Sequence, residues 1–407
     1  MDNKLWTKNF IFLLLSNALL FAGFHILLPT LPIYAAQNGG SGTQIGIIAG
    51  IFGFSAIFIR FFTDLGIKRL GKKKCLIIGI VISFICAASY VIFSSVNEII
   101  GIRLIHGFGF GLATTFYATI ASDIVPYSRR GEGMGYFGLG TTVAMALAPA
   151  AGVWLVKDYG FTIMFTCAAI SQVIALIWTF FCSAPKVVIE KAQVEDEYNS
   201  SLLSKFIEKG TRFPAMLTMF FGVGYGSVIA FIAMLAQEAH IENPGYFYLV
   251  GTLCIIMSRT ISGRLFDKKG YVWVILPGAV ILLSGLLLLT ITISQTMLLE
   301  AAVLYGFGVG MLHPALQTWM LNLVQAHRRG AASATFYNML DVGTSAGTIL
   351  LGIVAEKTGF IGMYRYSAGA MGIFLLAFVL FVLFIDNRAK AEKELEASTV
   401  ANNSSGL

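Results

Sequence analysis

Long apolar runs recur along the whole chain, and this pattern restricts the fold more than any other feature. A bilayer core about 30 Å thick takes about 20 apolar residues of helix to cross. Strands of a membrane barrel are shorter, at about 10 residues of alternating polarity. The pattern therefore predicts an all-α membrane protein with twelve transmembrane helices. We expect the spans at residues 9–35, 44–66, 75–94, 97–122, 132–156, 161–183, 212–237, 243–265, 272–293, 297–322, 331–354 and 362–385.

The composition agrees with a membrane location. Of the 407 residues, 57% are hydrophobic and 12% are charged, and the mean hydropathy is +0.79. Soluble globular domains carry about twice that share of charged residues. The first apolar run is longer than the hydrophobic region of a signal peptide and eleven similar runs follow it, so we expect it to stay in the protein.

The positions of the basic residues predict the orientation. Of the 28 lysines and arginines, 22 lie in the two termini and in every second loop, and the opposite loops hold only Lys157 and Lys357. By the positive-inside rule both termini then face the cytoplasm, and the protein lies in the cell membrane. The net charge of +7 is therefore a topology signal, and we expect no nucleic-acid partner.

The chain also repeats itself with an offset of 199 residues. Arg60 aligns with Arg259, and the GFGFG sequence at Gly107 aligns with GFGVG at Gly306. Each copy holds six spans, and six is even, so both copies enter the membrane from the same side and form a parallel repeat. The expected domains are a six-helix bundle at 1–183, a cytoplasmic linker at 184–211, a second bundle at 212–386 and a disordered tail at 387–407. The linker includes a short amphipathic stretch from Leu202 to Ile207 that could lie on the membrane surface.

Several motifs carry a family resemblance. The segment GRLFDKKG at residues 263–270 resembles the G-x-x-x-D-[RK]-x-G motif of the major facilitator superfamily, and Arg103 with the glycines after it resembles the arginine motif of the family's fourth helix. APAAG at 148–152 resembles the fifth-helix G-P-x-x-G motif of its proton-coupled exporters. The chain is similar to the family over nearly its whole length, and most similar in kind to bacterial drug/proton antiporters and arabinose-efflux-like permeases. The resemblance implies two pseudo-symmetric six-helix bundles and a cytoplasmic gating motif that comprises Gly263, Arg264, Asp267, Lys268 and Gly270.

The first copy of the gating motif departs from the pattern. Asp64 stands where the motif begins with glycine, Lys68 stands where it has aspartate, and Gly71 is kept. In the family the motif aspartate is thought to face a helix N-terminus and partner arginines on the cytoplasmic side. Asp64 and Lys68 are four residues apart and could pair along one helix, with Asp64 in the gating role. A solvated surface pair is the alternative, because exposed ion pairs contribute little.

The resemblance implies that helices 1, 4, 7 and 10 line the substrate cavity. Arg103 is the candidate to hold an anionic group or a carboxylate partner. His25 and His106 are also candidates, although hydrogen-bonded core histidines are the alternative for both. The full set of expected cavity residues is Asn17, Phe24, His25, Arg103, His106, Phe110, Thr114, Tyr117, Tyr225, Tyr305 and Gln317.

Asp341 is the most informative single residue, because it lies near the middle of the eleventh span. Acids at membrane depth are rare and mark proton or substrate pathways by default. We expect Asp341 to carry the coupling proton, with His313 on the neighbouring helix as relay or partner. The structural alternative is an acid that caps a broken helix or bonds to Asn338 and nearby hydroxyls.

Pro149 and Gly152 predict a bend in the fifth helix, since the second copy has Thr348 in place of the proline. In the family this bend is linked to export, and plain packing is the alternative. The glycine-rich stretches inside the helices lack the preceding strand that a nucleotide-binding motif needs, so we interpret them as close helix packing.

These observations predict a secondary active transporter of a small organic solute, most simply a proton-coupled exporter that works by alternating access. Uptake by symport or facilitated diffusion is an alternative, as is a sensor that kept the fold and lost transport. The chain contains no H-E-x-x-H, P-loop or nucleophile-elbow motif, so we expect no enzyme activity. The five cysteines have no metal-like spacing, and we expect no metal and no cofactor besides the proton. The expected partners are the substrate and the lipid bilayer, with the protein acting as a monomer.

Overall fold

The computed structural model describes residues 4–126, 129–183, 207–325 and 328–404, which form helices and no strands. The first bundle contains six helices. They are α1 (Lys8–Gln37), α2 (Gly42–Arg60), the short α3 (Thr63–Leu70), α4 (Lys72–Ile92), α5 (Val96–Ile124) and α6 (Arg130–Phe181).

The second bundle begins with a single 3-10 turn, η2 (Lys209–Thr211). Its five helices are α9 (Arg212–Glu238), α10 (Gly245–Lys269), α11 (Val272–Leu289), α12 (Gln295–Asn322) and α13 (Arg329–Ser404). We call the side of the bundles on which α1 begins the terminus side, and the side on which α1 ends the opposite side.

Local sequence explains several helix starts. The Ser41 hydroxyl accepts a hydrogen bond from the Gln44 amide while the Gln44 side chain accepts one from the Ser41 amide, which forms a capping box at the start of α2. Thr7 and Ser294 cap α1 and α12 in the same way with their hydroxyl groups. These caps satisfy amide groups that have no partner within the helix.

Two helices are long enough to cross the membrane twice. α6 has 52 residues and α13 has 76, and each contains one residue with non-helical backbone: Gly160 with φ 82° and Gly359 with φ 73°. Only glycine adopts this left-handed region without strain, and the two glycines are mates in the 199-residue repeat. Among the described residues ten helices are long and apolar enough to span a membrane. The expected twelve spans require α6 and α13 to cross twice each, and that count stays a prediction.

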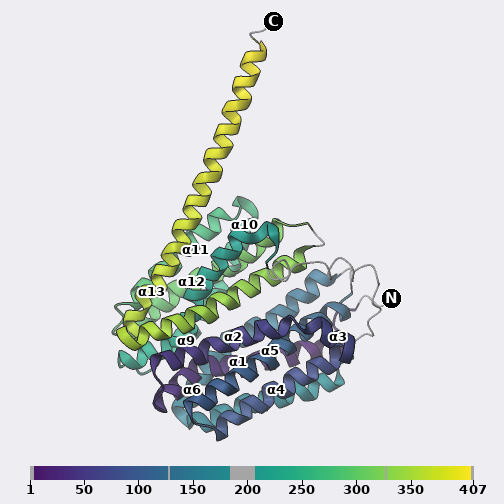
Figure 1. Ribbon diagram of the computed structural model, residues 1–407, viewed down its shortest axis with the longest axis vertical. Helices are drawn as coiled ribbons and strands as arrows, with labels where there is room; N and C mark the ends of the chain where they lie inside the picture. Colours follow the sequence, from purple (N-terminus) through teal and green to yellow (C-terminus); the bar gives the residue numbers. More distant parts are fainter. Residues whose placement is uncertain (1–3, 127–128, 184–206, 326–327, 405–407) are drawn as a thin grey trace.

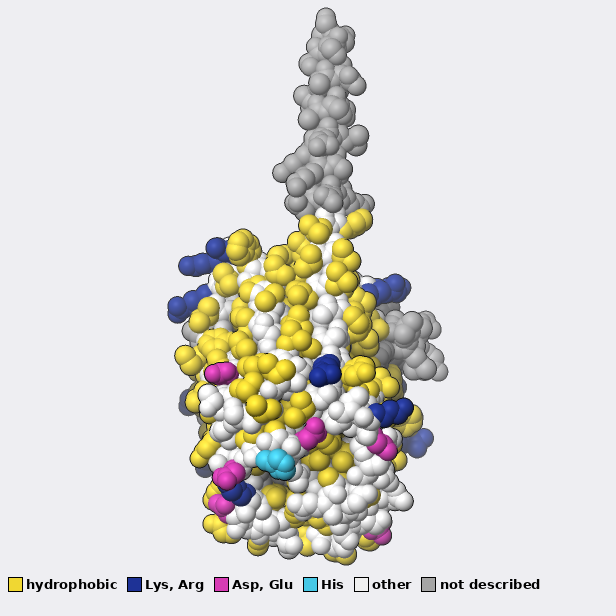
Figure 2. Space-filling model, turned by 90° about the vertical axis from the view of Figure 1, so that its left-hand side faces the viewer, with side chains coloured by type: hydrophobic (Ala, Val, Ile, Leu, Met, Phe, Trp, Pro, Cys, Tyr) yellow, Lys and Arg dark blue, Asp and Glu magenta, His cyan; other side chains and the backbone are white. Residues whose placement is uncertain are grey.

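The outer surface is apolar, as a lipid environment requires. Large hydrophobic side chains such as Ile92, Leu253 and Leu376 are more than half exposed. Figure 2 shows a face on which hydrophobic side chains cover much of the surface and charged side chains are scattered. A soluble monomer rarely exposes continuous apolar patches of this kind, so the exposed surface fits a bilayer.

The two bundles meet along three pairs of helices: α2 with α13, α6 with α10, and α1 with α9. In Figure 1 the first bundle (purple to blue) and the second bundle (green to yellow) diverge toward the side where the N-terminus lies. The inner surfaces of the two bundles are therefore in contact mainly toward the opposite side.

Two expectations concern the segments outside the bundles. The structure continues α13 as a helix to Ser404, and this end of the helix projects from the bundles (Figure 1). The predicted disorder of the tail from residue 387 stays a prediction. The tail's alanines, lysines, glutamates and leucine favour helix, and the low hydrophobicity on which the prediction rested does not oppose helix formation. Most of the linker, including the amphipathic stretch at 202–206, lies outside the described residues.

Candidate functional site

A row of glycines on α2 brings the two bundles into close contact. A Cβ atom added at Gly46 would lie 2.7 Å from the carbonyl oxygen of Thr348 and 2.9 Å from the Cα of Gly352. Gly42 and Gly50 face the same helix, α13, equally closely. Small residues at one-turn spacing let membrane helices approach in this way. The row therefore closes the interface between the bundles on the opposite side.

Polar contacts reinforce this closure near the helix ends. The Thr43 amide donates to the Glu356 carboxylate over 2.9 Å, from the start of α2 to α13. Lys157 on α6 donates to the side-chain oxygen of Asn243, just before α10, over 2.5 Å. Both contacts join one bundle to the other on the opposite side.

Deeper in the interface, Arg60 and Asp341 form an ion pair between the bundles. Nη1 of Arg60 lies 2.7 Å from Oδ2 of Asp341. Asp341 is 12 residues into α13, so at about 1.5 Å per residue it lies about 18 Å from the start of that helix. The two side chains keep 27% and 32% of their surface exposed. The pair is therefore at membrane depth and still accessible.

The repeat places a second contact at the matching position. Nη1 of Arg259 on α10 donates to the hydroxyl of Thr142 on α6 over 3.4 Å. Arg259 is the repeat mate of Arg60, and Thr142 is the mate of Asp341. The same cross-bundle contact therefore occurs twice, with a carboxylate acceptor in one copy and a hydroxyl in the other.

Arg259 is incompletely satisfied by this contact. Its Nε is buried and has no hydrogen-bond partner among the described residues. Tyr225 and Tyr337 lie within electrostatic reach of both Arg259 and Asp341. His313 lies within reach of Arg259. Together with Arg60, which pairs with Asp341, these side chains make up what we call the polar group between the bundles.

The expected relay between His313 and Asp341 is not assembled in this structure. The His313 ring packs against Phe336 with 4.9 Å between ring centroids, whereas the Asp341 carboxylate accepts a hydrogen bond from Arg60. Asp341 is thus joined to a partner on the other bundle. The role of His313 stays a prediction.

The expected cavity residues of α1 are bonded within the first bundle. Asn17 is 2% exposed and its amide donates to Thr141 over 2.8 Å. His25 is 5% exposed, and its Nδ1 lies 2.9 Å from the carbonyl oxygen of Phe21. Phe24 stacks on Phe52, with centroids 4.1 Å apart. In this conformation these three side chains face the interior of their own bundle.

The residues expected on the fourth span, which is α5, are also enclosed. Arg103 is 1% exposed; its Nε donates to the carbonyl of Ile48 over 3.1 Å and its guanidinium lies 4.5 Å from the centroid of Phe52. No carboxylate pairs with it among the described residues, and its Nη1 has no partner there. The other expected residues on α5 also have their partners within the first bundle. His106 contacts Tyr90, and Phe110 packs on Phe24. The Thr114 hydroxyl donates to the Phe110 carbonyl, and the Tyr117 hydroxyl bonds to Ser16 and Thr179.

Two expected cavity residues lie on α12. Gln317 donates to the Ser333 hydroxyl over 3.4 Å and to the Tyr337 hydroxyl over 3.5 Å. Tyr305 is 6% exposed and packs against Phe247. The structure thus connects Gln317, through Tyr337, to the polar group around Arg259, while Tyr305 belongs to the core of the second bundle.

The two gating motifs have the same backbone geometry. A glycine with positive φ follows each helix: Gly71 with φ 79° after α3, and Gly270 with φ 85° after α10. Lys68 is exposed, and the side chain of Asp64 lies outside the described part of the chain, so their pairing stays a prediction. In the second motif Gly263 borders open space, and the exposed side chains are Arg264, Asp267 and Lys268.

The predicted bend residues lie inside α6. A Cβ at Gly152 would lie 2.6 Å from the carbonyl oxygen of Ile26, so this glycine permits a close approach of α6 to α1. The backbone of α6 leaves helical geometry at Gly160, eleven residues after Pro149. A bend at Pro149 therefore stays a prediction.

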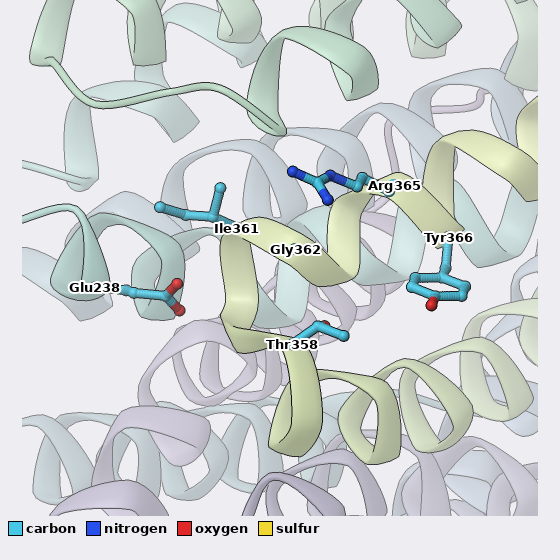
Figure 3. A pocket seen from close by; sticks show the side chains of 6 residues that line it. All are labelled: Glu238, Thr358, Ile361, Gly362, Arg365 and Tyr366. Carbon is cyan, nitrogen blue, oxygen red and sulfur yellow. The ribbon is translucent and has the colours of Figure 1, made fainter.

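Two cavities lie away from this polar group. One, of about 570 Å³, surrounds the turn at Gly359 and is lined by Glu238, Thr358, Ile361, Gly362, Arg365 and Tyr366 (Figure 3). The other, of about 490 Å³, lies between α6 and α10 on the opposite side and includes Trp154 and Asn243. Within the described chain no group of three His, Cys, Asp or Glu side chains could hold a metal ion.

Arg60, Arg259 and Thr142 were not among the site residues predicted from the sequence. Both arginines were visible as repeat mates inside the expected spans 44–66 and 243–265, and charge repeated at such a position is a usable signal. Their partners could not be found in this way, because the contacts cross from one bundle to the other.

Comparison with known proteins identifies the family. The Major Facilitator Superfamily model matches residues 13–348 and 262–404. The chain is 25% identical over 395 residues to multidrug resistance protein MdtG of Escherichia coli O9:H4, covering 90% of this chain and 92% of that protein. It is 21% identical over 373 residues to the staphylopine export protein of Staphylococcus aureus strain Mu50, covering 87% and 91%.

Solved structures agree on the fold. The nucleoside transporter NupG superposes with a TM-score of 0.72 at 15% identity, covering 93% of this chain and 99% of NupG. A bacterial homolog of the human lysosomal transporter Spinster, in an inward-facing and unoccupied conformation, also gives 0.72, at 14% identity and with 91% and 94% covered. Proteins of this family bind small molecules within the membrane and are not enzymes. The chain belongs to the Major Facilitator Superfamily and is a multi-pass membrane transporter.

Proposed function

We propose that the protein is a proton-coupled exporter of a small organic solute, and that Asp341 carries the proton. The observation that supports this most is the ion pair between Asp341 and Arg60, which joins the two bundles at membrane depth. An ionisable group at that depth is costly and marks a functional pathway by default. Since a third of the Asp341 side chain is exposed, water can deliver a proton to it.

Protonation would couple to the movement of the bundles. A neutral carboxyl loses its attraction for the Arg60 guanidinium, so α2 and α13 would lose the ionic contact nearest the terminus side. The glycine contacts at Gly42, Gly46 and Gly50 would remain. The balance between closure on the opposite side and closure on the terminus side would then depend on the protonation of one residue.

The orientation follows from the basic residues. With the terminus side in the cytoplasm, the cross-bundle contacts described above close the outer side, and the structure corresponds to an inward-facing state. The alternate state would expose Asp341 to the outside, where it would bind a proton.

Export is supported by the names of two relatives, multidrug resistance protein MdtG and the staphylopine export protein. Uptake is the alternative function, because the fold match to a nucleoside transporter is compatible with either direction. A screen of a deletion strain for altered susceptibility to toxic compounds would supply candidate solutes.

The test uses purified protein in proteoliposomes with an entrapped pH dye. A solute gradient should drive proton movement in the opposite direction, and Asp341→Asn should abolish this movement because the amide cannot carry a proton. Asp158→Asn is the matched control, since Asp158 is an exposed acid on the opposite side of the protein. Proton-coupled transport that persists in Asp341→Asn would refute the assignment.

A further inference from the structure

The two copies of the cross-bundle contact differ in charge. In one copy Arg60 meets the Asp341 carboxylate, and in the other Arg259 meets the Thr142 hydroxyl. The polar group between the bundles thus holds two guanidinium groups and one carboxylate. Among the described residues, one positive charge at membrane depth is left without a counter-charge, and such a charge is unfavourable until an anion neutralises it.

The geometry around Arg259 is suited to an incoming anion. Its Nε is buried without a partner among the described residues, while its Nη1 contact to Thr142 is long at 3.4 Å. A guanidinium presents its donors in a planar fork that matches the two oxygens of a carboxylate. At the interface between the bundles, Arg259 therefore has a hydrogen-bond donor for which the described residues provide no acceptor.

Arg103 is the other arginine with a buried donor that lacks a partner, but it differs in access. It is 1% exposed and lies inside the first bundle, with its guanidinium against the ring of Phe52. Arg259 is partly exposed and joins one bundle to the other. Of the two, Arg259 is the arginine that a solute between the bundles can reach.

We propose that Arg259 binds a carboxylate group of the transported molecule, in the position that a protein carboxylate occupies in the first copy. This proposal rests on the transport function above and adds its substrate class, an organic acid. Tyr225 and Tyr337, which lie within electrostatic reach of both Arg259 and Asp341, offer hydroxyl groups and ring faces to the rest of the molecule.

Exchange against protons adds a condition on the rest of the substrate. A purely anionic molecule beside Asp341 would favour the protonated carboxyl, so that substrate and proton would bind together. A cationic group placed beside Asp341 would favour the ionised carboxylate and release the proton. The carboxylate has a second oxygen, Oδ1, that can accept from such a group while Arg60 holds Oδ2. The class that satisfies both conditions is a zwitterion with a carboxylate and an amine.

The experiment compares four fluorescent probes at equilibrium, with the full chain in nanodiscs and no proton gradient. The probes are Nε-dansyl-lysine (zwitterion), dansylglycine (anion), dansylglycine amide (neutral) and dansylcadaverine (cation). We expect the two carboxylates to bind roughly tenfold to 100-fold more tightly than the neutral amide, as a charge-assisted contact provides. Nε-dansyl-lysine should bind most tightly and should release protons on binding.

Variants of Arg259 and Thr142 test the assignment. Arg259→Gln should remove the preference for carboxylates. Thr142→Asp should also remove it, because the new carboxylate would pair with Arg259 as Asp341 pairs with Arg60. Thr142→Asn is the matched control: it has the same shape as the aspartate without the charge and should keep the preference. Binding of dansylglycine amide, measured in every variant, reports whether the protein is folded.

Four results would overturn the proposal. The first three are equal binding of dansylglycine and its amide, an unchanged preference in Arg259→Gln, and loss of dansylglycine binding when chloride replaces methanesulfonate, a buffer anion without a carboxylate. The third result would assign Arg259 to an inorganic anion. The fourth result is loss of dansylglycine binding when the nanodisc contains phosphatidylglycerol. This result would assign Arg259 to a lipid headgroup and would refute the proposal.

The transport function can fail separately. If Nε-dansyl-lysine binds through Arg259 and its binding takes up protons, the substrate class is correct and proton exchange is wrong. If Asp341→Asn abolishes proton exchange while the protein shows no preference for carboxylate probes over the neutral amide, proton exchange is correct and the substrate class is wrong.

Discussion

The first and second copies of the repeat hold the same arginine at the same position of the bundle interface but give it different partners. Arg60 has a carboxylate from the other bundle, and Arg259 has a hydroxyl. The backbone framework is shared, since both bundles also turn at matching glycines, Gly160 and Gly359. The difference indicates that a duplicated framework can assign two tasks to one contact: in our proposal, the proton at the complete copy and the substrate at the incomplete one.

Moving the acid between the copies should have the largest effect. In the double variant Thr142→Asp with Asp341→Thr, we expect Arg259 to become paired and Arg60 to become the free guanidinium. Dansylglycine should still bind, and the binding should now depend on Arg60. Adding Arg60→Gln to this background should weaken dansylglycine binding by roughly tenfold or more, as measured by fluorescence titration.

The control for the double variant is the addition of Arg259→Gln in place of Arg60→Gln. This change should leave dansylglycine binding nearly unchanged, since Arg259 would already be neutralised. If dansylglycine binding depends on Arg259 both in the original protein and in the double variant, the position of the acid does not decide which arginine binds the carboxylate. This result would contradict the comparison of the two copies.

Blocking the contact between α2 and α13 should have the next largest effect. Gly46→Val places a side chain where an added Cβ already meets Thr348 oxygen at 2.7 Å, so α2 and α13 cannot stay in contact. We expect a longer distance between spin labels at Asn38 and Glu242, which are exposed on the opposite side of the two bundles, together with a large loss of transport.

Gly101→Val is the matched change for this test. Gly101 lies on α5 with no atom within 4 Å of an added Cβ, so the distance between the labels should stay the same. An unchanged distance in Gly46→Val would mean that the glycine row does not hold the opposite side closed.

The smallest effect should come from the exposed contact at the end of the same helices. Thr43→Val removes the hydroxyl that donates to Glu356 but keeps the amide that donates to it. Exposed polar pairs contribute little to stability. We therefore expect transport within about twofold of the original protein, measured with the same proteoliposome assay. A loss as large as that of Gly46→Val would show that the polar contact, and not the glycine row, controls closure.

Much of the fold could be predicted from the sequence because each span must bury its own backbone hydrogen bonds in lipid. The apolar runs predicted an all-α membrane protein, and the motif at residues 263–270 predicted its family, which the family match confirms. For the chain from Asn387 the sequence predicted disorder, which stays a prediction. The structure has α13 as a helix up to Ser404, and the low hydrophobicity of this segment does not oppose that conformation.

The candidate site was less predictable. Asp341 could be selected from its depth in an apolar run, but its partner Arg60 is 281 positions earlier and lies on the other bundle. For Arg103 the sequence indicated a charge in the membrane and could not indicate whether it faces the interface or the interior of one bundle. The structure places it in the interior, 1% exposed.

The sequence by itself determined that the chain crosses a membrane many times, that it consists of two related halves and that few charges lie at membrane depth. These properties depend on local composition and on self-similarity, both of which can be counted along the chain. The tertiary structure alone decided which charges meet, because the interface forms between helices α2 and α13 that are distant in sequence. It also decided that Arg259 keeps donors unused, since that depends on what the other bundle places opposite it: a hydroxyl, where the first copy has an acid.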